Sequence, residues 1–171
     1  MSNQDSLARI AVGVVVERRK GTTPWADFVW RPVAALPGVP ETPAWTLLAA
    51  DDERATLYAG SAEIALFRTE TANYRDNLAS GAPALWVVLR PTAGDPPYDL
   101  ILVTADPSEG EAYTESGADL VDSVPMPETV RTTLEEFVAA HHVEQPFHKR
   151  ERKRENPEAS GRAPIAKSGR T

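Results

Sequence analysis

The chain contains no cysteine among its 171 residues. This absence excludes disulfide bonds, thiolate metal sites, iron–sulfur ligation and a cysteine nucleophile. It also fits a reducing compartment, in which disulfides are rare. The chemistry of the protein must therefore rest on other side chains.

Long apolar runs are also absent. No run approaches the roughly 18 apolar residues that a membrane-spanning helix needs. The first residues, MSNQDSLARI, lack the basic region and the long apolar region of a secretory signal. We therefore expect a soluble, cytoplasmic protein without a membrane span.

The common phosphate-binding and nucleophile motifs are missing as well. Neither GxGxxG nor GxxxxGKS/T occurs, and GxSxG is absent too. These absences argue against the usual dinucleotide, P-loop and serine-hydrolase sites. Carboxylates are plentiful, but none stands in a pattern that singles it out for acid–base catalysis. We predict no catalytic residue and no bound cofactor.

All three histidines lie in one segment, AHHVEQPFHKR. A metal site there would use His142, Glu144 and His148, but this spacing is not HExxH and no further ligand stands out. Adjacent histidines at a helix C-terminus have a simpler explanation, because the helix dipole favours a protonated imidazole there. We therefore predict no metal site.

Charge divides the chain into two parts. Residues 148–171 carry eight Lys or Arg against three Glu, whereas residues 1–147 carry ten basic and 22 acidic side chains. An acidic body repels phosphate, which argues against nucleic acid as a partner. The basic segment has too few apolar residues to offset its ordering entropy. We expect one globular domain at 1–147 and a disordered basic tail at 148–171.

Apolar periodicity places strands mainly in the first two thirds of the chain and helices mainly in the last third. Strands are predicted at 10–16, 23–38, 45–50, 84–91 and 98–105, with a loop at ERRKGTTP after the first of them. Residues 55–67 are predicted as either two strands or one bent strand, with Gly60 at the bend or turn. The near-continuous apolar run at 84–91 predicts a central strand, with 98–105 as its hairpin partner. Helices are predicted at 69–79, where Thr69 can cap the start, and around 130–141. A third helix is predicted at 106–117, because DPSE places Asp106 at the N-cap and a proline at the first helical position. This order indicates an α+β protein. We expect a mostly antiparallel, strongly bent sheet or partial barrel, covered by the C-terminal helix.

The segment TPWADFVWRPVAALPG combines strand composition with an unusual set of side chains. On a strand, Trp25, Asp27 and Arg31 share one face, whereas Phe28 and Trp30 share the other, more apolar face. Phe28 and Trp30 should therefore point inward.

Proline in the same segment removes a backbone donor, so Pro32 predicts an edge strand or a break in the pairing. Asp27 and Arg31 are too far apart along one strand to pair directly. Glu17 and Arg19 have the parity to supply a cross-strand partner. Because Trp and Arg are favoured interface anchors, this strip is a candidate partner-binding surface. The alternative is that Trp25 only closes one end of the core.

Several separated segments together resemble a known family. They are RIAVGVVVERRKGTTPWADFVWRPVAALPG, ETANYRDNL, GAPALWVVLRP, VPMPETV and AHHVEQPFHKRERKR, which cover most of residues 10–154. In this order they are similar to a bacterial family known as domain of unknown function 3305. Members of that family tend to be encoded beside genes for molybdenum-dependent formate dehydrogenase and its accessory proteins.

This resemblance implies a role in maturing or regulating such an enzyme. We therefore predict a non-catalytic accessory protein that contacts a formate dehydrogenase subunit or a maturation factor through the strip around Trp25, Asp27, Trp30 and Arg31, together with the basic tail at 148–171. The alternative is a small-molecule binding protein or enzyme of molybdenum cofactor metabolism, with a pterin or nucleotide between the sheet and the C-terminal helix. In that alternative Arg31, Arg90 and Arg68 would meet phosphate, and Trp86 or Trp30 would stack on the ligand.

Overall fold

The computed structural model describes residues 6–23 and 27–143, so the predicted tail lies outside the described residues. Within them the chain forms seven strands, namely β1 (Ala8–Lys20), β2 (Phe28–Pro37), β3 (Thr46–Ala50), β4 (Arg54–Leu66), β5 (Ala84–Pro91), β6 (Tyr98–Thr104) and β7 (Leu120–Pro125). The helices are α1 (Thr71–Ala79), preceded by the 3-10 turn η1 (Arg68–Glu70), α2 (Pro107–Ser116) and α3 (Glu128–His141). The predicted α+β class is confirmed.

The first sheet has the strand order β2-β1-β4-β3, and every pairing in it is antiparallel. Its inner face follows from the alternation in β1, where Val12, Val14 and Val16 are completely buried. β1 continues to Lys20, through charged residues that were predicted to form a loop. Both neighbouring strands pair with this charged stretch, which keeps it extended.

Two of the irregularities in this sheet were predicted from small or cyclic residues. β2 is an edge strand, as Pro32 indicated, and its pairing slips between Val15 and Val16 of β1. Residues 54–66 form one bent strand rather than two, with a register shift beside Gly60. Gly60 has a φ of +119°, which residues with a side chain rarely adopt.

The second sheet has the order β6-β5-β7 and is also antiparallel. β5 is its central strand, as its near-continuous apolar run predicted, and β6 is its hairpin partner. β7 was not predicted at all. It pairs with the edge of β5 opposite β6, so its formation depends on residues far away in the sequence.

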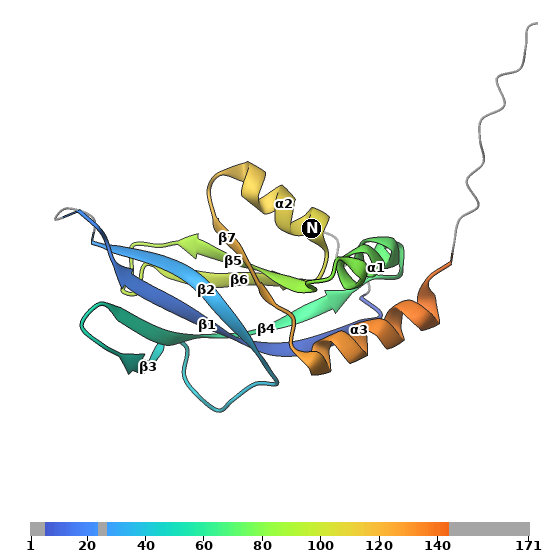
Figure 1. Ribbon diagram of the computed structural model, residues 1–171, viewed down its shortest axis with the longest axis horizontal. Helices are drawn as coiled ribbons and strands as arrows, with labels where there is room; N and C mark the ends of the chain where they lie inside the picture. Colours follow the sequence, from blue (N-terminus) through green and yellow to red (C-terminus); the bar gives the residue numbers. More distant parts are fainter. Residues whose placement is uncertain (1–5, 24–26, 144–171) are drawn as a thin grey trace, which may run out of the picture.

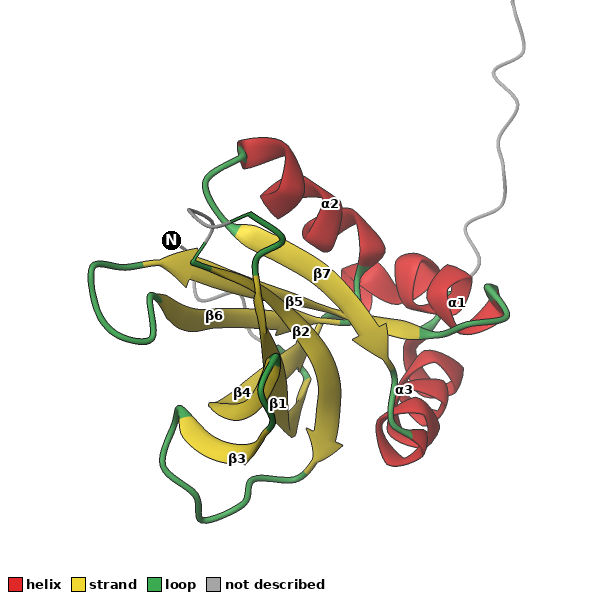
Figure 2. Ribbon diagram, turned by 60° about the vertical axis from the view of Figure 1, so that its left-hand side comes forward, coloured by secondary structure: helices red, strands yellow, loops and turns green. Residues whose placement is uncertain are grey.

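The two sheets enclose one hydrophobic core without closing into a barrel. β4 lies against β6 and β2 lies against β7, so the sheets approach each other along both sides. Figure 2 shows the two groups of strands turned across one another, with the helices gathered on one side. The predicted antiparallel pairing is confirmed, and the expected bent sheet or partial barrel takes the form of two antiparallel sheets that share a core and do not close.

The helices complete the core at the end of the molecule away from β3 (Figure 1). α3 buries Val130, Leu134 and Phe137, as its periodicity predicted, and Phe137 packs at 6.1 Å from the ring of Tyr74 in α1. Thr69 was expected to cap α1 but does not, because η1 occupies that position and α1 starts after Glu70 without a side-chain cap. None of the helices in the described residues is long and apolar enough to cross a membrane.

Candidate functional site

The predicted strip on β2 is visible from Asp27 onward, whereas Trp25 lies outside the described residues. Arg31 has a side chain that is 58% exposed and stands opposite Glu17 of β1, with 4.0 Å between its Nε and Glu17 Oε1. Arg19 Nη2 lies 3.5 Å from the same carboxylate oxygen. The predicted cross-strand partner is therefore present, and one glutamate serves two arginines. Asp27 is exposed and is not ion-paired within the described residues.

Trp30 lies on the opposite face of β2 and packs in the core. Its ring centroid is 6.0 Å from that of Tyr98 in β6 and 6.2 Å from that of Trp45, which precedes β3. The guanidinium of Arg18 lies 5.7 Å from the Trp30 ring centroid and 4.5 Å from that of Phe28. Trp30 thus joins both sheets at this end of the core, and its contact with a partner stays a prediction.

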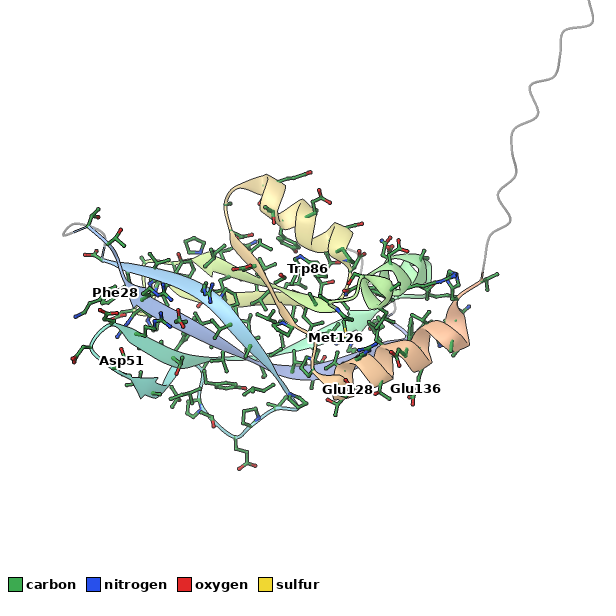
Figure 3. All side chains as sticks on the ribbon, in the orientation of Figure 1. Phe28, Asp51, Trp86, Met126, Glu128 and Glu136 are labelled. Carbon is green, nitrogen blue, oxygen red and sulfur yellow. The ribbon has the colours of Figure 1, made fainter. Side chains whose placement is uncertain are left out.

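Phe28 was predicted to be buried beside Trp30, and this is wrong, because its side chain is 44% exposed. The parity is correct, since Phe28 and Trp30 contact each other in an edge-on geometry with centroids 6.5 Å apart. Phe28 is the first residue of β2 and extends past the end of the core, where the guanidinium of Arg18 lies over its ring. Figure 3 shows Phe28 at the tip of the molecule, at the same end as Asp51.

Arg90 belongs to a different surface. It alternates with the buried Leu89 of β5 and points away from the core on the side of α2. Its Nε and Nη2 donate to the two carboxylate oxygens of Asp119 at 3.0 and 3.1 Å. These hydrogen bonds lower the pKa of Asp119 and raise that of Arg90. The structure therefore does not bring Arg90 and Arg31 together, because Arg90 pairs with Asp119 whereas Arg31 lies against Glu17.

Exposed apolar side chains gather on β2, β3 and the loop between them. Of the nine large apolar side chains that are exposed in the described residues, six lie there, namely Phe28, Val29, Leu36, Val39, Leu47 and Leu48. We call these six residues the β2–β3 apolar surface. β3 was predicted as a strand, but the exposure of its leucines was not. The acidic turn directly after it, DDE, was the available signal that this strand lies at a sheet edge.

A shallow depression of about 250 Å³ lies beside this surface, on the face of the first sheet that carries Arg31. It is lined by Glu17, Ala49, Ala50, Asp51, Arg54 and Thr56. Backbone hydrogen bonds from Glu53 and Arg54 lower the pKa of the Asp51 carboxyl and hold the turn after β3 in place. The depression is therefore a rigid, charged border of the β2–β3 apolar surface.

A larger cavity, of about 790 Å³, lies between the start of α1 and the end of α3. Its described lining is Arg68, Thr69, Thr71, Ala72, His141, His142 and Val143. Arg75 Nη1 lies 3.2 Å from His142 Nε2, and because a guanidinium only donates, this nitrogen accepts. His142 Nδ1 then donates to Thr71 Oγ1 at 3.1 Å, and the Thr71 hydroxyl donates to the Arg68 carbonyl.

This chain of hydrogen bonds uses both ring nitrogens of His142 to fasten α3 to α1. Glu144 and His148, the other members of the metal set considered above, lie outside the described residues. Residues 6–23 and 27–143 hold no group of three His, Asp or Glu side chains arranged to bind a metal ion. The role that the geometry shows for His142 is therefore structural.

The comparison with protein families gives one match. The model of a family described as "Protein of unknown function (DUF3305)" matches residues 11–151, which is most of the chain. The protein belongs to the DUF3305 family. No curated protein matches the chain, and no solved structure matches it.

Proposed function

We propose that this DUF3305 protein is a non-catalytic accessory protein that binds another protein through the β2–β3 apolar surface. The observation that carries the proposal is the concentration of exposed apolar side chains on these strands and their loop. β2 and β3 are the two edge strands of the first sheet, so these side chains lie along its two edges and the loop that joins them. Apolar side chains concentrated in this way on a folded domain favour an interaction site. Arg31 and the Glu17 carboxylate at its border supply charged groups that would orient a partner.

We further propose that the partner acts in the maturation or regulation of a molybdenum-dependent formate dehydrogenase. The gene neighbourhood that the family resemblance implies supports this choice of partner; no contact within the described structure bears on it. A dehydrogenase subunit and a maturation factor are both partners of the required kind.

The test is a pull-down from cells that express the dehydrogenase, with the full chain as bait. We expect wild type to recover a dehydrogenase subunit or a maturation factor, and Val29→Glu to lose most of it, because Val29 is exposed on β2. Glu111→Lys, on the exposed side of α2, is the matched control and should bind as wild type. If Val29→Glu recovered as much partner as wild type, the contact would lie on another surface. If wild type recovered neither a dehydrogenase subunit nor a maturation factor, the proposed link to the dehydrogenase would be wrong.

A second candidate function is favoured by the cavity between α1 and α3. Arg68 on its wall is exposed and His141 lies beside it, a combination that suits an anionic small molecule such as a pterin phosphate or a nucleotide. Thermal-shift measurements with guanine nucleotides and molybdopterin test this alternative. A stabilisation that disappears in Arg68→Ala would favour it, whereas no shift with any of these compounds would count against it.

A further inference from the structure

β3 differs from the other terminal strands of the two sheets. β2 lies against β7, and β6 lies against β4, so the terminal strands β2, β6 and β7 each have a neighbour in the other sheet. Among the described strands, β3 has extended contact only with β4. Its outer edge therefore presents backbone N–H and C=O groups to solvent without a neighbouring strand.

The residues of β3 do little to protect this edge. Natural edge strands are usually guarded by charged side chains or proline. β2 has both, because it contains Arg31, Pro32 and Pro37, whereas β3 reads TLLAA. Leu47 and Leu48 are 56% and 51% exposed. β3 is short, and its pairing with β4 is irregular between Leu47 and Ala49. These two features restrict how long a strand could pair with its outer edge.

The charges around β3 indicate what kind of strand would add. Asp51, Asp52 and Glu53 follow it directly, and Glu41 lies in the loop before it. The Asp51 carboxylate is occupied by two backbone N–H groups at 2.8 Å. Asp52 and Glu53 are exposed, and neither is ion-paired within the described residues. A partner with Lys or Arg next to its apolar residues would meet these carboxylates.

We propose that β3 is a strand-addition site for an extended segment of a partner protein. The apolar residues of that segment pack on Leu47 and Leu48, and a Lys or Arg at its end pairs with Asp52 or Glu53. Backbone hydrogen bonds supply most of the attraction in such complexes, and side-chain contacts select the partner. This inference rests on the proposed binding role and names the chemistry of the partner.

The same charges argue against a second copy of this chain as the occupant. Antiparallel pairing of β3 with itself would place the acidic turn after one β3 next to the Glu41 loop of the other copy, so like charges would approach. A pair of five-residue strands also buries far less than the roughly 1,200 Å² of a stable interface. A basic segment from another protein avoids the repulsion.

The experiment uses the full chain, labelled for NMR, and two short synthetic peptides of alternating valine and threonine, one with arginine at both ends and one with glutamate. We expect the arginine peptide to shift the amide signals of residues 46–50 and to bind about fivefold more tightly than the glutamate peptide. The double variant Asp52→Lys with Glu53→Lys should reverse this preference. Leu48→Lys should weaken both peptides, and both variants change exposed side chains.

Three outcomes would overturn the inference. They are no shift at residues 46–50 at millimolar arginine peptide, equal binding of the two peptides, and a charge preference that survives the double variant. The second copy is tested with Leu48→Cys, because the chain has no other cysteine. A disulfide-linked dimer in quantitative yield would assign the edge to self-association instead. None of these measurements uses the dehydrogenase, so their failure is distinct from failure of the pull-down.

Discussion

At the scale of single residues, Asn77 does the most to join different parts of the fold. Its side-chain nitrogen donates to the carbonyls of Ala84 and Ala105 at 2.8 and 2.9 Å, and its oxygen accepts from the Ala84 N–H at 3.0 Å. These groups lie at the start of β5 and just after β6, so one buried amide holds α1 to both strands. This role could not be predicted from the sequence, because a helical asparagine is usually solvated.

Asn77→Ala should lower the free energy of unfolding by about 2–4 kcal/mol, because it leaves buried backbone groups without partners. Urea denaturation followed by circular dichroism measures this. Asn73→Ala is the control, since the Asn73 side chain donates a partly buried hydrogen bond to the Glu70 carboxylate, and it should cost well under about 1 kcal/mol. A cost for Asn77→Ala no larger than that of the control would contradict the assigned role.

Tyr58, unlike Asn77, buries a polar group that is not hydrogen-bonded within the described residues. Its side chain is 2% exposed, and its hydroxyl has no hydrogen-bond partner among the described residues. Gly13 leaves the space that the ring occupies, since a Cβ at that position would lie 2.8 Å from the ring. The buried hydroxyl therefore costs stability, while the ring fits closely.

Tyr58→Phe should raise the free energy of unfolding by about 1 kcal/mol, because it removes the unpaired polar atom and keeps the ring. Thermal and urea unfolding both test this. Tyr98→Phe provides a comparison at a partly buried site. A clear loss of stability in Tyr58→Phe would mean that the hydroxyl has a partner that the described residues do not show.

At the scale of elements, strands with a regular apolar pattern were predictable and β7 was not. The alternation in β1 and the apolar run of β5 each specify a strand locally. β7 reads LVDSVP, which is short, half polar and ends in proline. It is a strand because Val124 faces the core and its backbone pairs with β5. Because that pairing involves a strand that is distant in the sequence, the local periodicity of β7 does not predict it.

The start of α2 was predictable and has an electrostatic consequence. Asp106 caps the helix by accepting from the Ser108 N–H at 2.9 Å, as the sequence DPSE indicated. Burial raises the pKa of Glu109 in the first turn, and the nearby Asp106 charge raises it further. The same carboxylates and burial raise the pKa of Tyr74 to about 12. The carboxyl groups of Asp106 and Glu109 therefore lie near each other at the N-terminus of α2, where burial partly shields them from solvent.

A carboxyl whose pKa is raised by folding binds its proton more tightly in the folded state than in the unfolded chain. The contribution of Glu109 to stability is therefore most favourable below the ordinary pKa of 4.5 and is lost as pH rises through the folded value. Glu109→Gln should be more stable than wild type at neutral pH, and its advantage should shrink as pH falls toward 4.5. Urea midpoints across this range test the sign, and a variant that is less stable at neutral pH would contradict it.

The contact between α2 and β5 requires glycine at position 110. A Cβ there would clash with Cγ of Trp86 and would lie 2.6 Å from its Cδ1 and 2.8 Å from its Cβ. Figure 3 shows Trp86 directly below α2. In an open helix, replacing glycine by alanine stabilises by about 1 kcal/mol. At position 110 the clash with Trp86 should instead make the replacement by alanine destabilising.

Gly110→Ala should lower the free energy of unfolding by about 1–3 kcal/mol, because the fixed Trp86 ring forces α2 away from the sheet. In the background Trp86→Ala the same substitution should cost less, since Cγ and the ring atoms are gone and the contact with Cβ remains. Urea denaturation of the four proteins closes this double-mutant cycle. Equal costs in both backgrounds would show that Trp86 does not limit the approach of α2.

At the scale of the whole molecule, sequence reasoning reached the class of the fold and one border of the candidate surface. It placed Arg31 on the outer face of β2 and found Glu17 as its partner, because both follow from strand parity. It did not separate Arg31 from Arg90, since which sheet each strand joins is decided by long-range pairing. It also missed Leu47 and Leu48, because exposure at an edge depends on which strands lie next to it.

The measurement that tests the central claim most directly is deletion of the gene followed by assay of formate dehydrogenase activity and of its metal and cofactor content. We predict that activity falls, that wild type and Glu111→Lys restore it, and that Val29→Glu restores little, because the β2–β3 apolar surface is disrupted. Unchanged activity after deletion, or full restoration by Val29→Glu, would contradict the account.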